Sequence, residues 1–555
     1  MNDAARHAVS VVGRRLAAAK SWWAPATLCL MVAAAATWPV LLRDGWPYNH
    51  EALSLFQRTE AFRRAFLALD LWPVWTPFAH NGHGSAWPLF YHRLFTALSA
   101  ALALPLGSLA GTKAAIFLTL SGGIAGALFA ARSLSTSGWA LAAVAITFGF
   151  AQYVFFDWLI RGAGAEFAAM MLVPWLLGLL IRTTRGMKSW IALALVLALL
   201  FFAHSIILLY AVFLFPGFAL VAILRGQLRH WIAQVGLAAG VAAVICLPSA
   251  LAILRMGPHF NLDVLHIFRP RTEFVSLGRF IWDDTFRWGR QWGNVGVEVG
   301  PAVIALAVLV LFLAALRRVR HGWADAAALL FPLAIYGYLL TPGSLWFFEA
   351  SKYLELIQFP WRVLTYVTPL LILLPVALLD EVESGPRVWR WLTRSLLVVS
   401  AGVTVGLGAR CFRLEYPVFP SEMIRADLRA LDQPWSAREY LPRAVARRGV
   451  PPRQPFVATS GCTKVAADPS EASRTQVHLG ALTVSASSGG ECVVHLSQFV
   501  TPLLAVERSA GIAVEETPYR TYAFRLAPGE HTLTVRARSL FSIAFLSTPH
   551  ALAPK

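Results

Sequence analysis

The stretch "RDGWPYNHEALSLFQR" places acids, an imidazole and a guanidinium directly after a long apolar run. It contains Asp44, His50, Glu51 and Arg58. If a helix starts at His50, then His50, Ser54 and Arg58 share one face, because residues four apart are neighbours on a helix. A carboxylate can take a proton from a hydroxyl and a guanidinium can hold a phosphate. The alternative interpretation is an interfacial amphipathic helix whose charges are solvated.

A second stretch, "FFDWLIRGAGAEF", surrounds a Gly-Ala-Gly-Ala turn at the head of an apolar run. It contains Asp157, Arg161 and Glu166, and ionisable residues at a span end that faces a cavity are functional candidates. The structural alternative is an Arg161–Glu166 ion pair, since an acid is favourable near a helix N-terminus. Arg362 begins a later apolar run, where it can snorkel or bind a phosphate. His204 lies between two apolar runs, a position more typical of a packing residue than of a site.

The segment 254–298 is rich in basic residues, which can grip phosphate or contact lipid headgroups. These are Arg255, His259, His266, Arg269, Arg271, Arg279, Arg287 and Arg290. Elsewhere, His80 and His83 are three residues apart, but no further ligand spacing supports a zinc site. The sequence also contains no glycine-rich phosphate loop of the Walker type, so it predicts no nucleotide pocket.

Composition decides which class of protein must position these side chains. The chain has 555 residues, of which 57% are hydrophobic and 14% are charged, with a mean hydropathy of +0.58. Soluble proteins carry about 25% charged residues, so a soluble enzyme, a disordered chain and a disulfide scaffold are excluded. The formal net charge of +18 is explained by basic cytoplasmic loops of a membrane protein, and no nucleic-acid partner is predicted.

Apolar runs predict a polytopic α-helical membrane protein with about eleven spans. The number depends on 88–106 being a hairpin that dips into the membrane without crossing it. The short basic loops then all fall on the cytoplasmic side, with the N-terminus inside and the C-terminus outside. About twelve or thirteen spans is the alternative. The predicted spans are 24–42, 112–131, 138–156, 165–181, 189–203, 205–224, 231–253, 299–316, 324–341, 363–380 and 395–409.

From about residue 450 the pattern changes to short β-branched and aromatic runs separated by Gly and Pro, which predicts an extracytoplasmic all-β sandwich or jelly roll. The predicted strands are Val477–Ser485, Glu491–Val500, Tyr519–Leu526 and His531–Ala537. A Cys462–Cys492 bridge can form if this region faces an oxidising compartment. The predicted organisation is a membrane domain over 1–410 with external loops 43–111 and 254–298, a connector over 411–450 and a β-domain over 451–555.

Together these motifs resemble the bacterial integral membrane proteins described as 6-pyruvoyl-tetrahydropterin synthase-related, which are similar to GT-C superfamily glycosyltransferases. The matching features are Asp44 with His50 and Arg58, "NGHGSAWPLFYHRL" (81–94), "RGAGAE" (161–166) followed by Pro174, His204 after an apolar run, "IQFPWR" (357–362) and "REYLP" (438–442). The resemblance implies a GT-C-like bundle in the bacterial inner membrane and a polyprenyl-phosphate-linked sugar donor. It also implies a catalytic acid in the first external loop, at Asp44 or at its neighbour Glu51.

The predicted function is therefore an extracytoplasmic glycosyltransferase that moves a sugar from a polyprenyl-phosphate carrier to a cell-envelope glycan or lipid acceptor. Asp44 or Glu51 would deprotonate the acceptor hydroxyl, and direct displacement would invert the anomeric carbon. The expected phosphate- and substrate-binding residues are His50, Arg58, Arg161, Glu166, His204 and Arg362.

The predicted partners are the lipid-linked donor, the acceptor and membrane lipids. No cofactor and no metal ligand are predicted. Dependence on a divalent cation stays an open alternative. Two other classes of protein remain as alternatives, a flippase or transporter for lipid-linked sugars and a non-catalytic envelope scaffold. A transporter of the common type would show an inverted repeat, and none is visible in the sequence.

Overall fold

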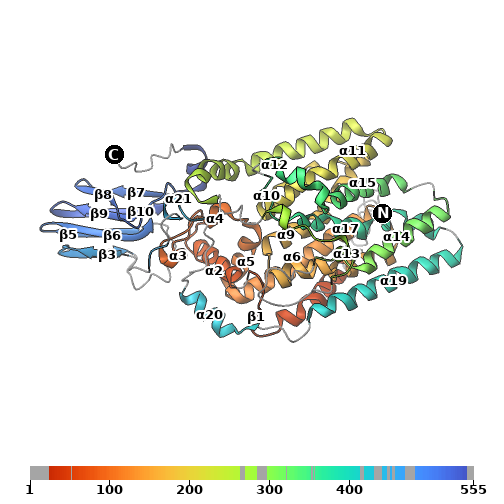
Figure 1. Ribbon diagram of the computed structural model, residues 1–555, viewed down its shortest axis with the longest axis horizontal. Helices are drawn as coiled ribbons and strands as arrows, with labels where there is room; N and C mark the ends of the chain where they lie inside the picture. The colour runs from red at the N-terminus through yellow and green to blue at the C-terminus, as the bar shows by residue number, and fades with distance from the viewer. Residues whose placement is uncertain are drawn as a thin grey trace, which may run out of the picture. The chain divides into compact units, whose positions relative to one another are not determined.

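The computed structural model consists of helices and β-sheets (Figure 1). It describes residues 24–51, 53–262, 269–283, 297–319, 322–351, 354–355, 357–384, 386–412, 418–430, 440–446, 450–452, 457–468 and 482–546. The chain forms two compact units, each assembled from three segments. Unit 1 comprises Met1–His50, Ala114–Ala242 and Pro270–Val418, and unit 2 comprises Glu51–Lys113, Ala243–Arg269 and Phe419–Lys555. These divisions differ from the predicted ones, because the first loop groups with the β-strands.

Within the described residues, eight helical segments are long and apolar enough to cross a membrane. They are Ala24–Leu41, Ser108–Arg132, Gly138–Arg161, Gly164–Thr184, Trp190–Leu224, Leu228–His259, Pro360–Glu383 and Arg387–Phe412. Trp323–Leu339 and Pro342–Glu349 add a ninth if this pair, bent by 88°, counts as one span. The chain is therefore a multi-pass membrane protein, and its exact number of spans stays a prediction.

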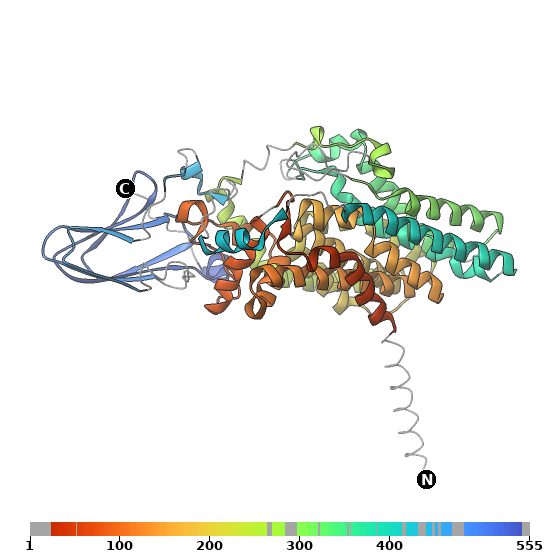
Figure 2. The same ribbon diagram turned by 90° about the horizontal axis from the view of Figure 1, so that it is seen from below.

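Most of the long helices of unit 1 are apolar on all sides, which suits helices surrounded by other helices or by lipid, whereas the helices Val376–Glu383 and Arg387–Ala409 each have a polar face. The most apolar windows of Gly164–Thr184 and Pro360–Glu383 are each 89% buried, so these two spans form the centre of the bundle. At its edge, α14 (Pro301–Leu316) and α19 (Arg387–Ala409) lie side by side (Figures 1 and 2). The remaining helices are α6 (Ser108–Arg132), which begins in unit 2, α7 (Gly138–Gly149), α8 (Gln152–Phe155), α9 (Gly164–Thr184), α10 (Trp190–Tyr210), α11 (Phe215–Leu224), α12 (Leu228–Met256), which ends in unit 2, α13 (Leu277–Ile281), α15 (Trp323–Leu339), α16 (Leu345–Glu349), α17 (Leu364–Leu373) and α18 (Val376–Glu383).

The segment Trp190–Leu224 turns back on itself at His204. A straight helix of its 35 residues would be about 52 Å long. However, Arg225 donates a hydrogen bond of 2.8 Å to the Thr184 hydroxyl, so the chain enters and leaves this segment at the same end of the bundle. Inside α10, His204 is the residue that departs from helical geometry, with φ −167° and ψ 103°. His204 therefore joins two helical arms, as the two apolar runs predict.

The interval 157–164 between the predicted spans 138–156 and 165–181 is helical over most of its length. The helical run that contains α7 and α8 continues through a π-helix, η1 (Phe156–Arg161), so only Gly162 and Ala163 separate it from α9. A π-helix has a wider turn than an α-helix and is frequent at functional sites. Asp157 and Arg161 are consequently held on a helix.

The run 88–106 becomes two helices in unit 2, α4 (Trp87–Phe90) and α5 (Leu94–Leu106). The 13 residues of α5 are fewer than the about 20 that a span needs. The predicted helix at the start of the first loop is α2 (Ser54–Leu67), which begins four residues after His50. His50 therefore does not share a helix face with Ser54 and Arg58, and that prediction is wrong. Two further short helices of unit 2 are α3 (Ala79–Gly82) and α21 (Arg443–Ala446).

The C-terminal region contains two four-stranded antiparallel sheets. One has the order β4-β5-β10-β7 and the other β3-β6-β9-β8, and their inward side chains belong to one hydrophobic core. The strands are β3 (Val457–Ser460), β4 (Lys464–Asp468), β5 (Leu482–Ser488), β6 (Cys492–Phe499), β7 (Leu504–Arg508), β8 (Ile512–Glu516), β9 (Thr521–Leu526) and β10 (Gly529–Ala537). Two more short strands occur, β1 (Trp46–Pro47) and β2 (Val418–Phe419). The disulfide between Cys462 and Cys492 is present, as predicted.

The aromatic segment around residues 72–90 is part of the core of unit 2. Trp75 is 1% exposed and donates a hydrogen bond of 3.0 Å from its indole nitrogen to Gln498 on β6. Both ring nitrogens of His83 lie within hydrogen-bond distance of backbone oxygens, those of Ser497 and Pro452. Trp75 and Trp87 of this segment are thus buried inside unit 2.

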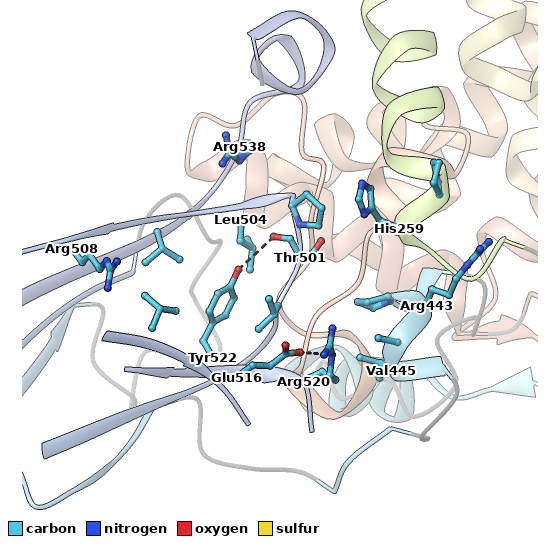
Figure 3. A pocket seen from close by; sticks show the side chains of 17 residues that line it. His259, Arg443, Val445, Thr501, Leu504, Arg508, Glu516, Arg520, Tyr522 and Arg538 are labelled. Carbon is cyan, nitrogen blue, oxygen red and sulfur yellow. Dashed lines mark hydrogen bonds and ion pairs between the residues drawn. The ribbon is translucent and has the colours of Figure 1, made fainter. Parts of the chain in front are cut away.

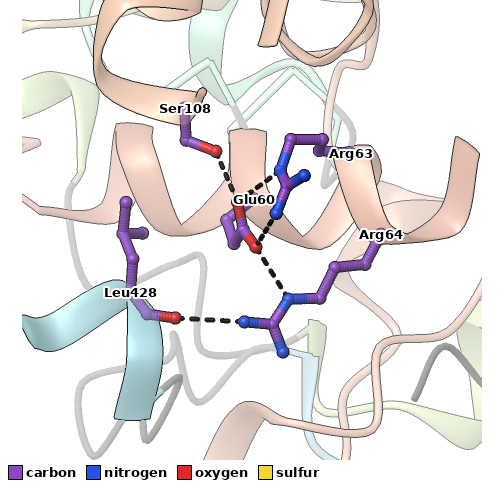
Figure 4. A network of polar contacts seen from close by, with 5 residues as sticks. All are labelled: Glu60, Arg63, Arg64, Ser108 and Leu428. Carbon is purple, nitrogen blue, oxygen red and sulfur yellow. Dashed lines mark hydrogen bonds and ion pairs between the residues drawn. The ribbon is translucent and has the colours of Figure 1, made fainter. Parts of the chain in front are cut away.

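The predicted connector 411–450 also contributes to unit 2, through the amphipathic helix α20 (Ser421–Ala430). Gln57 on α2 donates a hydrogen bond of 2.7 Å to Asp427, and Arg64 donates one to the Leu428 backbone oxygen. The buried carboxylate of Glu60 holds this arrangement by accepting hydrogen bonds from Arg63, Arg64 and Ser108 (Figure 4).

Glu60→Gln is expected to lower the free energy of unfolding of unit 2 by about 3 kcal/mol, because it leaves Arg64 buried without its anion. Burial alone would raise the pKa of Glu60, but the hydrogen bonds from Arg63, Ser108 and Arg64 outweigh it and lower the pKa. This stabilisation is therefore present above the ordinary glutamate pKa of about 4.3 and is lost as the pH falls through the lowered value. Thermal unfolding in detergent between pH 7 and pH 3 measures it, with the exposed Glu422→Gln as control. A pH profile unchanged by Glu60→Gln would contradict the assignment.

Candidate functional site

Four ionisable side chains of unit 1 form an acid–arginine cluster, consisting of Asp157, Arg161, Glu166 and Arg362. Arg161 Nη1 lies 2.7 Å from Glu166 Oε2 and 3.1 Å from Asp157 Oδ1. Arg362 Nε lies 3.1 Å from the same Glu166 oxygen, although these two residues are 196 positions apart. The predicted Arg161–Glu166 pair is thus confirmed, and Arg362 joins it.

The cluster lies where three candidate spans meet. Arg161 ends the span Gly138–Arg161, Glu166 belongs to the first turn of α9, and Arg362 belongs to the first turn of Pro360–Glu383. Because the three span ends converge, the cluster lies toward one end of the helix bundle of unit 1. Glu166 is also favoured electrostatically by the N-terminus of α9.

The cluster is nearly closed to solvent. Asp157 and Glu166 are 0% and 1% exposed, and Tyr153 donates a hydrogen bond of 3.1 Å to Glu166 Oε1. Two carboxylates and two guanidiniums balance in formal charge, which is how buried ions are tolerated. Within the described part of the chain, Asp157 Oδ2 has no hydrogen-bond partner.

Both arginines retain donors that the protein does not use. A guanidinium has five N–H donors, and Arg161 contacts both acids through Nη1 alone while Arg362 contacts Glu166 through Nε alone. Their other N–H groups make no hydrogen bond with any residue that the structure describes. The Trp361 ring lies 4.7 Å from the Arg161 guanidinium and the Phe359 ring 4.9 Å from that of Arg362. The arrangement can therefore orient two flat cations toward one anion.

The turn after Arg161 has a backbone that only glycine accommodates well. Gly162 has φ 68°, and a Cβ placed on it would lie 2.5 Å from the side-chain nitrogen of Asn49. Asn49 reaches this point because its side-chain amide donates a hydrogen bond of 3.4 Å to the Leu159 backbone oxygen. The His50 backbone nitrogen donates a second hydrogen bond, to the Ile160 backbone oxygen. The start of the first loop is thus anchored on η1, beside Arg161.

Gly162→Ala is expected to separate the Asn49–His50 segment from η1 and to tilt Arg161 away from Glu166. An alanine at this position must adopt a positive φ, and its methyl group has no room beside Asn49. The free energy of unfolding should therefore fall by about 1–3 kcal/mol. Protease sensitivity of the 43–50 segment in membranes measures the loss of anchoring. Gly240→Ala on α12, where a Cβ meets nothing within 4 Å, is the matched control. Equal sensitivity of both variants and the wild type would contradict this role.

His204 lies on the same side of the bundle as the cluster. The helix α9 starts near Glu166 and ends near Thr184, and the two arms of Trp190–Leu224 run from the Thr184 end to His204 and back. Tyr366, four residues after Arg362 on the same span, donates a hydrogen bond of 2.6 Å to the backbone oxygen of Ile207. Because Ile207 is three residues after His204, this bond places His204 near the cluster.

The structure does not bring the other predicted site residues into the cluster. Asp44 is exposed, in a bend that follows Ala24–Leu41. In unit 2, Glu51 forms an ion pair of 2.8 Å with Arg58, whose guanidinium lies 3.9 Å from the centre of the Tyr91 ring. Burial alone would lower the pKa of Arg58, but the charge of Glu51 outweighs it and the pKa is raised. Arg58 is therefore a permanent cation already neutralised by Glu51.

The basic segment 254–298 is described only in part, and His266, Arg287 and Arg290 lie outside the described residues. Of the rest, Arg279 pairs with Asp283 at 2.9 Å and the exposed Arg271 pairs with Glu349 at 3.1 Å. Among the described residues, no group of three or more His, Cys, Asp and Glu side chains could hold a metal ion.

Sequence reasoning missed Tyr153 as a member of the site and did not include Asp157 among the expected binding residues. A signal was available for Tyr153, because a tyrosine inside a long apolar run needs a partner for its hydroxyl. It lies four residues before Asp157 on the same helical run, the spacing that brings side chains to one face.

Two comparisons with known proteins complete this description. No protein-family model matches the chain, and no curated protein matches it. What can be said of the site therefore depends on its own residues, which form a buried acid–arginine cluster with unused guanidinium donors in a multi-pass membrane protein.

Proposed function

We propose that the protein is a membrane glycosyltransferase of the GT-C type that moves a sugar from a polyprenyl-phosphate carrier to a cell-envelope glycan or lipid acceptor. The observation that carries the proposal is the pair of guanidiniums at the converging span ends, Arg161 and Arg362, each with N–H donors that no described residue uses. A lipid-linked donor keeps its tail in the bilayer, so its phosphate lies where spans end.

In this mechanism the leaving group is the lipid phosphate, which gains negative charge as the glycosidic bond breaks. Arg161 and Arg362 stabilise that charge, and Glu166 keeps both guanidiniums in place without acting as a base. Preorganised donors in a buried site act strongly because little water competes with them. The donor is already activated, so the reaction needs no nucleotide.

The acceptor hydroxyl must lose a proton as it attacks the anomeric carbon, and direct displacement inverts the configuration there. The proposed base is Asp44, with Glu51 as the alternative. Asp44 is exposed and lies on the segment that Asn49 and His50 anchor beside Arg161. Glu51 is engaged with Arg58, which favours a structural role for it.

The proposed location is the bacterial inner membrane, with the N-terminus in the cytoplasm and the C-terminal β-domain in the periplasm. The Cys462–Cys492 disulfide supports an oxidising compartment for the β-strands. We interpret the two sheets as a β-sandwich that orients the acceptor.

Sugar transfer by the purified full chain in lipid nanodiscs tests the proposal. The donor pool is a total polyprenyl-phosphate-sugar extract, the acceptor pool is a total cell-envelope glycan and lipid extract, and the readout is the loss of sugar from the donor lipid by mass spectrometry. We expect Asp44→Asn to reduce the rate by about two to four orders of magnitude and Glu51→Gln to reduce it far less. Equal activity of both single variants and the wild type would overturn the assignment of the base.

A flippase for lipid-linked sugars is the second candidate, and the charged cluster inside the bundle favours it. It would move the same substrate without changing its mass. A non-catalytic scaffold would tolerate substitutions at Arg161 and Arg362 without loss of the envelope glycan. The nanodisc experiment separates these classes, since only a transferase changes the lipid chemically.

A further inference from the structure

Unit 2 contains a cavity of about 580 Å³ (Figure 3). It lies between the ends of several strands and two short helical segments. Its walls come from β7, β8, β9, the residues after β10, α21 and the turn Gly257–His259.

The charged side chains around the cavity are mainly cationic. The cations are Arg443, Arg508, Arg520 and Arg538, and the one acid is Glu516. Glu516 forms an ion pair with Arg520 and so neutralises one arginine. Arg520 has φ 65°, a strained backbone for a residue with a side chain, and such strain is common at binding sites. A clear excess of positive charge remains.

Arg538 has a hydrogen-bond donor that an anionic ligand in the cavity could satisfy. Its Nε is buried and has no hydrogen-bond partner within the part of the chain that the structure describes. A buried donor without a partner costs free energy, and an anion in the cavity would remove that cost. Figure 3 shows Arg538 and Arg443 on different sides of the cavity.

The rest of the wall is apolar and suits an amphiphile. Leu504, Val506 and Val514 line the cavity beside the arginines, together with Tyr522. Burial raises the pKa of Tyr522 to about 12, so its hydroxyl is a neutral donor at physiological pH. It lies 3.4 Å from the Thr501 oxygen.

The cavity also lies at the end of a membrane span. His259 is the last residue of the candidate span Leu228–His259. Near that end, Arg255 donates a hydrogen bond to the Ile543 backbone oxygen. Phe541 is 61% exposed, Leu254 is 69% exposed, and the rings of Phe541 and Phe545 are 4.7 Å apart. Exposed apolar side chains that lie close together are typical of surfaces that contact a membrane or another protein.

We propose that this cavity binds the phosphate ester headgroup of an anionic membrane lipid, with Arg538 as the contact to phosphate and with Arg443 and Arg508 adding positive charge around the cavity. The apolar wall takes the acyl-chain side of the lipid. A water-soluble sugar phosphate has the same phosphate chemistry, and the experiment below distinguishes the two sources. The proposal does not depend on the transferase function.

The test is native mass spectrometry of the full chain released from nanodiscs, with phosphatidylglycerol and phosphatidylcholine as competing lipids. We expect the wild type to retain phosphatidylglycerol, and Arg443→Gln/Arg538→Gln to retain it at least about tenfold less. Arg536→Gln is the matched control, because Arg536 lies on β10, two residues before Arg538, is exposed and pairs with Glu507. A thermal unfolding curve of each sample identifies a folding defect, in which case Arg508→Gln, at an exposed position, replaces the double variant.

Glycerol 3-phosphate, added in solution to protein in phosphatidylcholine nanodiscs, decides the source of the phosphate. Saturable binding that needs Arg538 would support the phosphate site and assign it to a soluble ester. Retention of phosphatidylglycerol without binding of glycerol 3-phosphate would support the lipid. Equal lipid retention by the wild type, the double variant and Arg536→Gln would overturn the proposal, whatever the sugar-transfer assay shows.

Discussion

Arg161→Gln is expected to reduce sugar transfer by about two to three orders of magnitude, because it removes a preorganised donor from the leaving phosphate. Arg161→Lys should restore only part of the rate, since an ammonium cannot bind Glu166, Asp157 and a phosphate in one plane. The rate of donor consumption in nanodiscs measures both effects.

The matched control for this experiment is Arg182→Gln at the other end of α9. Arg182 lies over the Phe129 ring at 5.2 Å, away from the acid–arginine cluster. We expect it to leave the rate within about a factor of three of the wild type. If Arg161→Gln retained the wild-type rate while folded normally, the cluster would be structural and the proposed role of Arg161 would be wrong.

Glu166→Gln is expected to have the largest effect on stability, because it leaves Arg161 and Arg362 close together with only Asp157 to compensate them. Removing one member of a buried ion pair costs about 3–5 kcal/mol. The midpoint of thermal unfolding in detergent measures the loss.

The double variant Arg161→Gln/Glu166→Gln should be more stable than the sum of the two single losses predicts, with a coupling of about 0.5–3 kcal/mol. Additive losses would show that Arg161 and Glu166 do not interact in the folded protein, which would contradict the 2.7 Å contact.

Part of the candidate site is predictable from local sequence. "RGAGAE" contains Arg161 and Glu166 five residues apart across a turn, and the predicted ion pair forms. That Arg362 contacts the same carboxylate depends on the packing of α9 against α17, which no local pattern contains. The π-helix is not predictable either, because one wide turn leaves the apolar pattern of a span unchanged.

The strands that the sequence predicts are the central ones. The four predicted strands correspond to β5, β6, β9 and β10, although residues 477–481 of the first lie outside the described residues. The four missed strands, β3, β4, β7 and β8, are all edge strands. Edge strands are short and carry charged residues, as in "LAVER" of β7, so their hydrophobic alternation is weak.

The burial of the aromatic segment around Trp75 is not predictable from local sequence, for another reason. Its tryptophans, prolines and glycines are equally typical of a loop at the membrane surface and of a buried turn. Only the long-range contact of Trp75 with Gln498 on β6 shows that the segment is buried.

The most direct test of the central claim is lipid mass spectrometry of polyprenyl-phosphate-linked sugars in a deletion strain. The strain is complemented with the wild type, Arg161→Gln, Asp44→Asn or the control Arg182→Gln, at matched levels of protein in the membrane. A transferase predicts that one defined lipid-linked sugar accumulates in the deletion strain and with the Arg161 and Asp44 variants, and returns to normal with the wild type and the control. An identical lipid-linked sugar pool in every strain would contradict the proposed donor and the function built on it.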